Sequence, residues 1–158
     1  MPSMKKSKRL PTTKGVSRSE NMRRITSKNT TPELIVRRLL FRHGFRYRLH
    51  RADLPGNPDI VFVSQCKVIF VHGCFWHAHS CRVAHRPRTN EGYWSLKLQR
   101  NQERDARHLV ALKTAGWDVL TIWECELRDI ASVTRKLIRF LNHAAKAPPR
   151  IQARASSH

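Results

Sequence analysis

The stretch from Cys66 to Cys81 constrains the fold of this chain more than any other part of its 158 residues. It begins with an apolar, β-branched run, Val68 to Val71, which is typical of a buried strand. The run breaks at Gly73, and the loop that follows carries two thiols, two imidazoles and two large rings: Cys74, Phe75, Trp76, His77, His79 and Cys81. A strand that ends in such side chains is a poor structural connector, so we predict that the functional site lies at its end.

The chain is strongly basic, with 31 Lys and Arg against 11 Asp and Glu and a net charge of +20. This exceeds what solubility requires and favours a polyanionic partner, of which nucleic acid is the default. Charge alone does not exclude a ribosomal-type or merely cationic protein. Because no stretch is long and apolar enough to span a bilayer or to form a signal peptide, we expect a soluble, cytoplasmic protein.

Composition divides the chain into one domain with two basic extensions. Residues 1–17 hold five Lys and Arg and almost no apolar side chains, which predicts a disordered arm. Residues 144–158, rich in Ala, Pro, Lys and Arg, predict a disordered tail. Residues 18–143 are long enough to bury a hydrophobic core of their own.

The domain is predicted to be α/β, with a mixed sheet flanked by helices. Thr30, Pro32 and Glu33 form a helix start with a capping box, and Gly44 ends that helix after about His43. From this pattern alone, Glu33 is best interpreted as a capping carboxylate. The other expected elements are strands at 45–50, 60–63, 67–72 and 117–123, a long helix from Thr89 or Asn90 to about 115, and a helix from about 129 to 141.

The second and third of these strands are close enough in sequence to form a hairpin over 59–72. An acid at the start of one strand then lies beside the residues that end its partner. The hairpin therefore predicts that Asp59 lies near Val71 and His72. A carboxylate and a backbone oxygen suit Mg²⁺, and an imidazole beside the ion can take a proton from water. Asp59, His72 and His77 can thus serve phosphodiester hydrolysis, although each histidine taken singly is more often a structural one.

Cysteines in a cytoplasmic protein favour metal binding or catalysis over disulfides. Cys66 stands alone at a strand start and is best interpreted as a small packing residue. Cys74, His79 and Cys81 share one loop, and Cys125 follows the last strand. Three thiolates and an imidazole describe a structural zinc site, which we favour over free thiols although the spacing is not that of a zinc finger.

Aromatic side chains form a third group. Phe75 and Trp76 are adjacent, and Tyr93 and Trp94 follow the next basic loop. Rings of this kind can insert between the base pairs of a nucleic-acid duplex that a basic protein binds, or they can be buried beneath the loop. On the long helix, Lys97, Asn101, Asp105 and His108 recur at helical spacing, which is usual for a solvated face.

From about residue 18 to 141 the sequence resembles the very short patch repair (Vsr) DNA mismatch endonucleases. The motifs that carry the resemblance are SENMR at 19–23, LPGNPD at 54–59, VIFVHGCFWH at 68–77 with His79 and Cys81, NQERD at 101–105, GW at 116–117 and WEC at 123–125. The resemblance implies a restriction-endonuclease-like fold and Mg²⁺-dependent nicking of DNA 5′ to the thymine of a T:G mismatch. Such mismatches arise when 5-methylcytosine deaminates.

The resemblance also implies residue roles. His77 would be the general base, supported by Asp105, and the ion would be held by Asp59, the backbone carbonyl of Val71 and, through water, His72 and Glu33. The zinc ligands would be Cys74, His79, Cys81 and Cys125. A wedge that enters DNA from the major groove would be formed by Phe75, Trp76 and Trp94. Met22 would contact the minor groove, and Lys97 and Asn101 would face the mispair.

Two other functions remain open on the sequence. One is a zinc-stabilised module that binds distorted DNA without cutting it, and the other is a restriction-type nuclease that cuts both strands. The resemblance suggests a monomer acting at the bacterial nucleoid, and general mismatch-repair proteins are candidate partners that the sequence does not test.

Overall fold

The computed structural model describes residues 28–82, 84 and 87–144. The predicted arm 1–17, most of the predicted tail and Met22 lie outside the described residues. The elements follow the order α2 (Thr31–Arg42), β1 (Arg48–Leu49), β2 (Ile60–Phe62), η1 (Val63–Gln65), β3 (Lys67–His72), α3 (Glu91–Thr114), β4 (Asp118–Trp123), η2 (Glu124–Arg128) and α4 (Ile130–Asn142). The predicted mixed α/β architecture is confirmed. Within the described ranges, no helix has the length and apolar character needed to cross a membrane.

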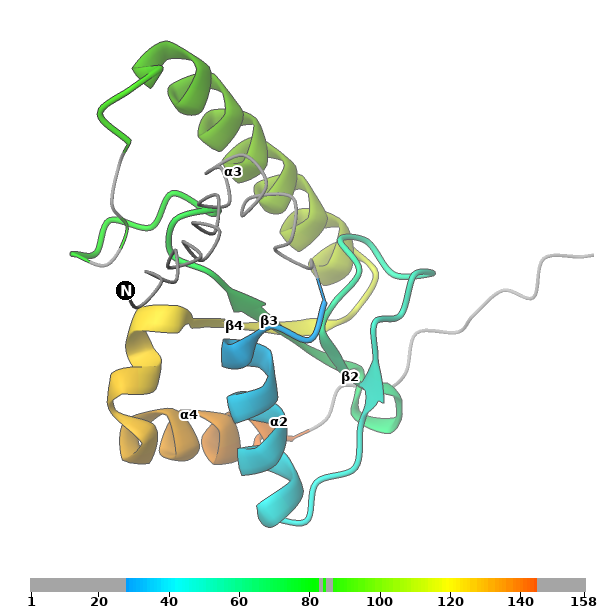
Figure 1. Ribbon diagram of the computed structural model, residues 1–158. Coiled ribbons are helices and arrows are strands. Elements are labelled where there is room, and N and C mark those ends of the chain that lie inside the picture. Colours follow the sequence, from blue (N-terminus) through cyan, green and yellow to red (C-terminus); the bar gives the residue numbers. More distant parts are fainter. Residues whose placement is uncertain (1–27, 83, 85–86, 145–158) are drawn as a thin grey trace, which may run out of the picture.

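The four strands form one sheet in the order β1-β2-β3-β4. β1, β2 and β3 pair antiparallel, and β3 pairs with β4 in parallel. The predicted hairpin is therefore present, with Ile60 opposite Ile69. In the parallel pair His72 lies opposite Trp123, so the carboxyl ends of these two strands lie at the same end of the sheet. α3 makes the crossover that a parallel pair requires (Figure 1).

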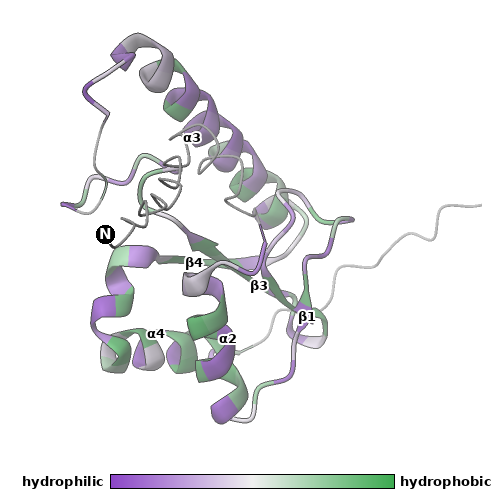
Figure 2. Cartoon of the chain, in the orientation of Figure 1, coloured by the Kyte–Doolittle hydropathy of each residue, from purple (hydrophilic) through white to green (hydrophobic). Residues whose placement is uncertain are grey.

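Alternation along the strands divides the core into two layers. Ile60, Ile69 and Val71 face one side and pack with residues of α2 and α4. Val61, Val68 and Phe70 face the other side and pack with Leu112 of α3 and Trp117. Figure 1 shows α2 and α4 on the same side of the sheet and α3 on the opposite side, and Figure 2 shows that α3 is predominantly hydrophilic.

One local expectation was wrong, and one expected helix start has an unusual cap. The strand expected over 45–50 is reduced to Arg48–Leu49, because His50 has a left-handed φ of 47° that ends it. Phe45 and Tyr47 nevertheless point inward, since both pack edge-on against Phe62. The long helix begins at the expected place, but its N-cap Asn90 is left-handed and its side chain makes no capping hydrogen bond.

Gly56 provides a test of how the loop before β2 is fixed. Its φ is +77°, and a Cβ atom there would lie 2.9 Å from Nδ1 of His108 on α3. Gly44 has a similar φ of +80° with nothing within 4 Å of its Cβ position, so it is a matched control. We expect Gly56→Ala to lower the free energy of unfolding by about 2–3 kcal/mol and Gly44→Ala by about 1 kcal/mol, measured by urea denaturation. Equal losses would show that His108 does not pack against this loop.

Candidate active site

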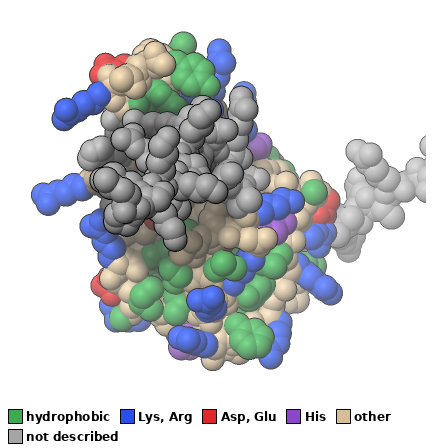
Figure 3. Space-filling view, viewed as in Figure 1, with side chains coloured by type: hydrophobic (Ala, Val, Ile, Leu, Met, Phe, Trp, Pro, Cys, Tyr) green, Lys and Arg blue, Asp and Glu red, His purple; other side chains and the backbone are tan. Residues whose placement is uncertain are grey.

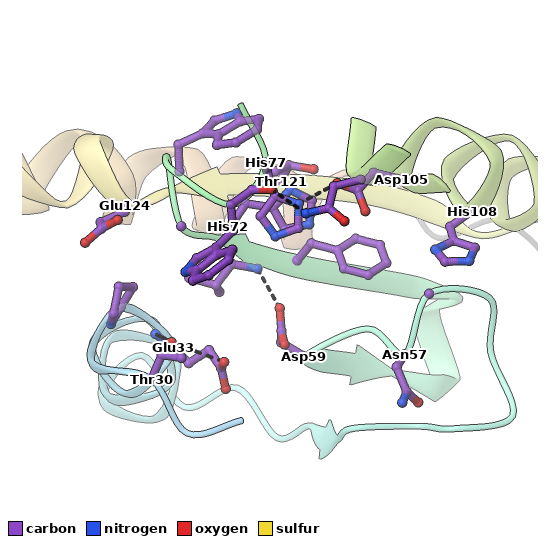
Figure 4. Close-up of a pocket in the computed structure, with 18 of the residues that line it drawn as sticks. Thr30, Glu33, Asn57, Asp59, His72, His77, Asp105, His108, Thr121 and Glu124 are labelled. Carbon is purple, nitrogen blue, oxygen red and sulfur yellow. Dashed lines mark hydrogen bonds and ion pairs between the residues drawn. The ribbon is translucent and has the colours of Figure 1, made fainter. Parts of the chain in front are cut away.

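Asp59 lies directly before β2, at the mouth of a cleft of about 880 Å³. The hairpin register brings it beside the end of β3, where its Oδ2 accepts a hydrogen bond of 2.7 Å from the backbone N–H of Val71 (Figure 4). Burial, with a smaller contribution from the nearby Glu33 carboxylate, outweighs the hydrogen bond from Val71 and raises the pKa of the Asp59 carboxyl to about 6. A half-buried carboxylate held in this way is a strong candidate ligand for a cation.

His72 and His77 lie against each other at the end of β3. Their ring centroids are 3.7 Å apart and their planes differ by 1°, so the imidazoles are stacked. Trp123, at the end of β4, meets the His72 ring edge-on at 5.3 Å. Nδ1 of His77 contacts Oδ2 of Asp105, which reaches the cleft from α3. Helical spacing alone suggested that this face of α3 is solvated. The face instead supplies a carboxylate to the site.

The environment gives these groups different proton affinities. Burial, together with the neighbouring His77, lowers the pKa of His72 to about 4, so this imidazole is neutral at physiological pH. Burial alone would raise the pKa of the Asp105 carboxyl, but the hydrogen bond and charge of His77 outweigh burial and lower it. Asp105 is therefore ionised and orients His77 through Nδ1, which leaves Nε2 of His77 for other partners.

Glu33 both caps α2 and lines the cleft. Thr30 Oγ1 accepts from the backbone N–H of Glu33 at 3.4 Å, which confirms Thr30 as the N-cap. The Glu33 carboxylate accepts from Thr30 Oγ1 at 3.1 Å and from the backbone N–H of Asn29 at 2.9 Å. It also pairs with Arg37 at 3.0 Å, and Arg37 contacts His50 at 2.8 Å. The sequence analysis missed Arg37 and His50, and the only signal for Arg37 was its i,i+4 spacing from Glu33.

The predicted residues thus line one cleft but form two groups within it. Asp59 lies with Glu33 and His50, and one ligand atom from each of the three lies within 4.8 Å of the others. His72, His77 and Asp105 form a second group that meets the same criterion. The sequence analysis had placed Asp59 directly with the two histidines. The pair of His77 and Asp105 was implied by the family resemblance, whereas the grouping of His50 with Asp59 and Glu33 was not anticipated.

The four predicted zinc ligands do come together. One ligand atom each from Cys74, His79, Cys81 and Cys125 lies within 4.8 Å of the others. The parallel register of β3 and β4 explains this, because Cys74 and Cys125 each follow two residues after the paired His72 and Trp123. Burial, together with the neighbouring thiols, raises the pKa of the Cys74 thiol to about 12. A metal would deprotonate such thiols outright, and four S and N donors at this spacing fit a closed tetrahedral zinc site.

The predicted aromatic wedge is also one cluster. Phe75, Trp76 and Trp94 meet edge-to-face, with ring centroids 5.0 to 6.2 Å apart. Nζ of Lys97 lies 5.3 Å from the Trp94 centroid and 5.6 Å from that of Trp76. Asn101 donates from Nδ2 to the backbone carbonyl of Trp76 at 2.9 Å, so α3 fastens the aromatic loop.

Figure 3 shows many exposed Lys and Arg side chains and few acidic ones on the face in view.

Comparison with known proteins identifies the family. The model of a family described as DNA mismatch endonuclease Vsr matches residues 12–83. The DNA mismatch endonuclease Vsr of Escherichia coli (strain K12) is 42% identical over 118 residues, which cover 75% of this chain and 76% of that protein. The chain belongs to the Vsr family of DNA mismatch endonucleases.

Two further proteins are similar to this chain. The type II nicking enzyme V.XorIIP of Xanthomonas oryzae pv. oryzae is 50% identical over 121 residues, 77% of this chain and 89% of that protein. The catalytic domain of the homing endonuclease I-Bth0305I is 26% identical with a TM-score of 0.49, covering 71% of this chain and 94% of that one. This Vsr-family protein is thus a DNA endonuclease, which decides against a module that only binds DNA.

Replacing one cysteine tests the zinc site. Cys125→Ser is expected to abolish bound zinc and to lower the thermal midpoint by about 10 °C or more, because binding energy at such a site is folding energy. Cys66→Ala is the control, since Cys66 is buried but outside the cluster. Metal content by mass spectrometry and thermal unfolding measure both effects. Full zinc occupancy in Cys125→Ser would rule out the four-ligand set.

The raised pKa of Asp59 predicts a cost in stability. A carboxyl whose pKa is about 6 in the fold instead of 3.8 destabilises the protein wherever it is ionised. At about pH 8 without added Mg²⁺, we expect Asp59→Asn to stabilise the zinc-loaded protein by on the order of 2–3 kcal/mol. The gain should vanish as the pH falls through about 6 towards 3.8, since the wild-type carboxyl then binds a proton. The exposed Asp53 provides the control Asp53→Asn, for which no stabilisation is expected.

Proposed function

We propose that this endonuclease nicks one strand of duplex DNA 5′ to the thymine of a T:G mismatch, with Mg²⁺ as the catalytic ion and Zn²⁺ as the structural one. The mismatch would be the product of 5-methylcytosine deamination, and the nick would initiate very short patch repair. We further propose that the protein acts as a monomer in the bacterial cytoplasm. The observation that carries the proposal is the His77–Asp105 pair, which lies in the same cleft as the half-buried carboxylate of Asp59.

The proposed general base is His77. Asp105 accepts from the Nδ1–H of His77, so the neutral ring presents an unprotonated Nε2. That nitrogen can take the proton of an attacking water, and the ionised Asp105 stabilises the imidazolium that results. His72 stacks on His77 and stays neutral because of its lowered pKa, so the second ring adds no competing positive charge.

The proposed cation site is built around Asp59. Its carboxylate and the backbone carbonyl of Val71 supply the hard oxygen ligands that Mg²⁺ prefers, and Glu33 and His72 would hold water beside them. Such an ion, when bound, supplies positive charge to the scissile phosphate. Oε2 of Glu33 already accepts from Asn29 and Arg37, which suits this carboxylate to holding a water through Oε1 rather than to ligating directly.

Mismatch recognition is assigned to the aromatic cluster and its neighbours on α3. The aromatic cluster consists of the rings of Phe75, Trp76 and Trp94. Insertion of such rings between base pairs costs a few kcal/mol per step. A mispaired step costs less to open, so such a wedge favours T:G over T:A. Lys97 and Asn101 would then face the mispair, for which Asn101 must exchange its bond to the Trp76 carbonyl. The zinc site holds the loop that carries two of these rings.

The test is strand-specific cleavage of end-labelled duplexes by zinc-loaded protein, with and without Mg²⁺. We expect one nick in the T strand of a T:G duplex, no cut in the opposite strand and no cleavage of the T:A duplex. Asp59→Ala should abolish nicking, and His77→Ala should slow it by about 10²–10⁴-fold, while both still bind the mismatch.

Asp53→Ala is the matched control, because this exposed aspartate pairs with Arg51 outside the cleft. It should nick as the wild type does. Wild-type rates in Asp59→Ala would refute the site, and cutting of both strands would identify a restriction-type nuclease instead.

A further inference from the structure

Arg37 is buried on the face of α2 that packs against the sheet, where its side chain is about 10% exposed. A buried guanidinium is costly unless acceptors surround it. Three acceptors serve its Nη1 and Nη2 atoms: Asn29 Oδ1 at 2.8 Å, Glu33 Oε2 at 3.0 Å and His50 Nε2 at 2.8 Å. Nε is buried without a hydrogen-bond partner among the described residues. This buried cation therefore ties the helix start, the capping carboxylate and the residue after β1 into one network beside the cleft.

The contact with Arg37 fixes the protonation of His50. A guanidinium has only donors, so Nε2 of His50 must be the acceptor and the neutral ring carries its proton on Nδ1. The backbone of His50 is tied to the site as well, because its N–H donates to the carbonyl of Asp59 at 3.4 Å.

The network also decides how Glu33 faces the cleft. A carboxylate has about four acceptor positions. Within the described part of the chain, donors from Asn29 and Arg37 occupy Oε2, and Thr30 occupies one position on Oε1. One position on Oε1 is left beside Asp59, whose carboxylate is within 4.8 Å of the Glu33 ligand atom. Arg37 also supplies the positive charge that offsets repulsion between these two carboxylates.

We propose that Arg37 and His50 are positioning residues of the cation site: His50, as a neutral acceptor, orients the guanidinium of Arg37, which locks Glu33 in place beside Asp59 before the ion binds. Neither residue touches the reacting atoms. The proposal rests on the proposed function in taking this cleft as the Mg²⁺ site. Figure 4 shows Glu33 and Asp59 on the same side of the cleft, across from His77 and Asp105.

The acceptor role of His50 can be tested with a matched pair of variants. Gln can accept a hydrogen bond from Arg37 at about the position of Nε2, whereas Leu fills similar space and cannot. Binding of Mn²⁺ to the zinc-loaded protein is measured by electron paramagnetic resonance, independently of cleavage. We expect His50→Leu to weaken Mn²⁺ binding by about 10–100-fold, and His50→Gln to stay within about threefold of the wild type.

Arg37→Lys is the second variant. It keeps the positive charge, but a single ammonium cannot reach three acceptors arranged around a planar fork. We expect a loss of Mn²⁺ affinity similar to that of His50→Leu, about 10-fold or more. The Mg²⁺ concentration for half-maximal nicking should rise in parallel, while affinity for a T:G duplex without Mg²⁺ and the zinc content should not change. A merely structural role would lower the thermal midpoint without this selective effect on the ion.

The outcomes separate this proposal from the proposed function. Unchanged Mn²⁺ affinity in His50→Leu and Arg37→Lys would overturn the positioning role, as would equal losses in His50→Leu and His50→Gln. A wild-type protein that binds Mn²⁺ but does not nick a T:G duplex would refute the proposed function, and the ranking of variants by Mn²⁺ affinity would still decide the role of His50 and Arg37.

Discussion

The structure depends on β3 and on the two different pairings along its edges. Its antiparallel partner β2 begins just after Asp59, and its parallel partner β4 ends in Trp123. A strand pairs residue by residue with both neighbours. The register of β3 therefore places Asp59, the stacked His72 and His77, and Cys74 at one end of the sheet. A slip of one residue would invert the faces of β3 and move Asp59 away from the backbone N–H of Val71.

The irregular segment after β3 is stabilised by polar contacts rather than by a hydrophobic core. Residues 74–78 form turns, and Cys74 is the buried anchor among them. The four clustered ligands attach this segment to the end of β4, and Asn101 and Gln102 of α3 donate to its backbone carbonyls. Because this loop is held by polar contacts on two sides, its large rings can lie at the surface. A loop held only by apolar burial would have to bury the same rings.

The cleft concentrates negative charge in a protein of net charge +20. Four carboxylates line the cleft. Glu33 pairs with Arg37, Asp59 lies near His50, Asp105 contacts His77, and Glu124 accepts from the backbone N–H of Cys74. The surrounding basic surface suits a polyanion, whereas the carboxylates suit a cation. This contrast is what a metal-dependent nuclease requires, because the DNA and the ion must meet at one place.

The sequence by itself determined the elements and the chemical inventory. Local signals sufficed for the capped start of α2 and the 59–72 hairpin, because caps, turns and strand alternation act over a few residues. The chemistry of the side chains sufficed to select Cys74, His79, Cys81 and Cys125 as one cluster. Only the tertiary structure decided that β1 is short and that His50 joins Asp59 and Glu33. The contact of Asp105 with His77 was implied by the family resemblance and not by any local pattern. Arg37 and His50 lie 13 residues apart, and no pattern joins them. Their contact exists because α2 packs against the sheet, and that packing depends on the whole core.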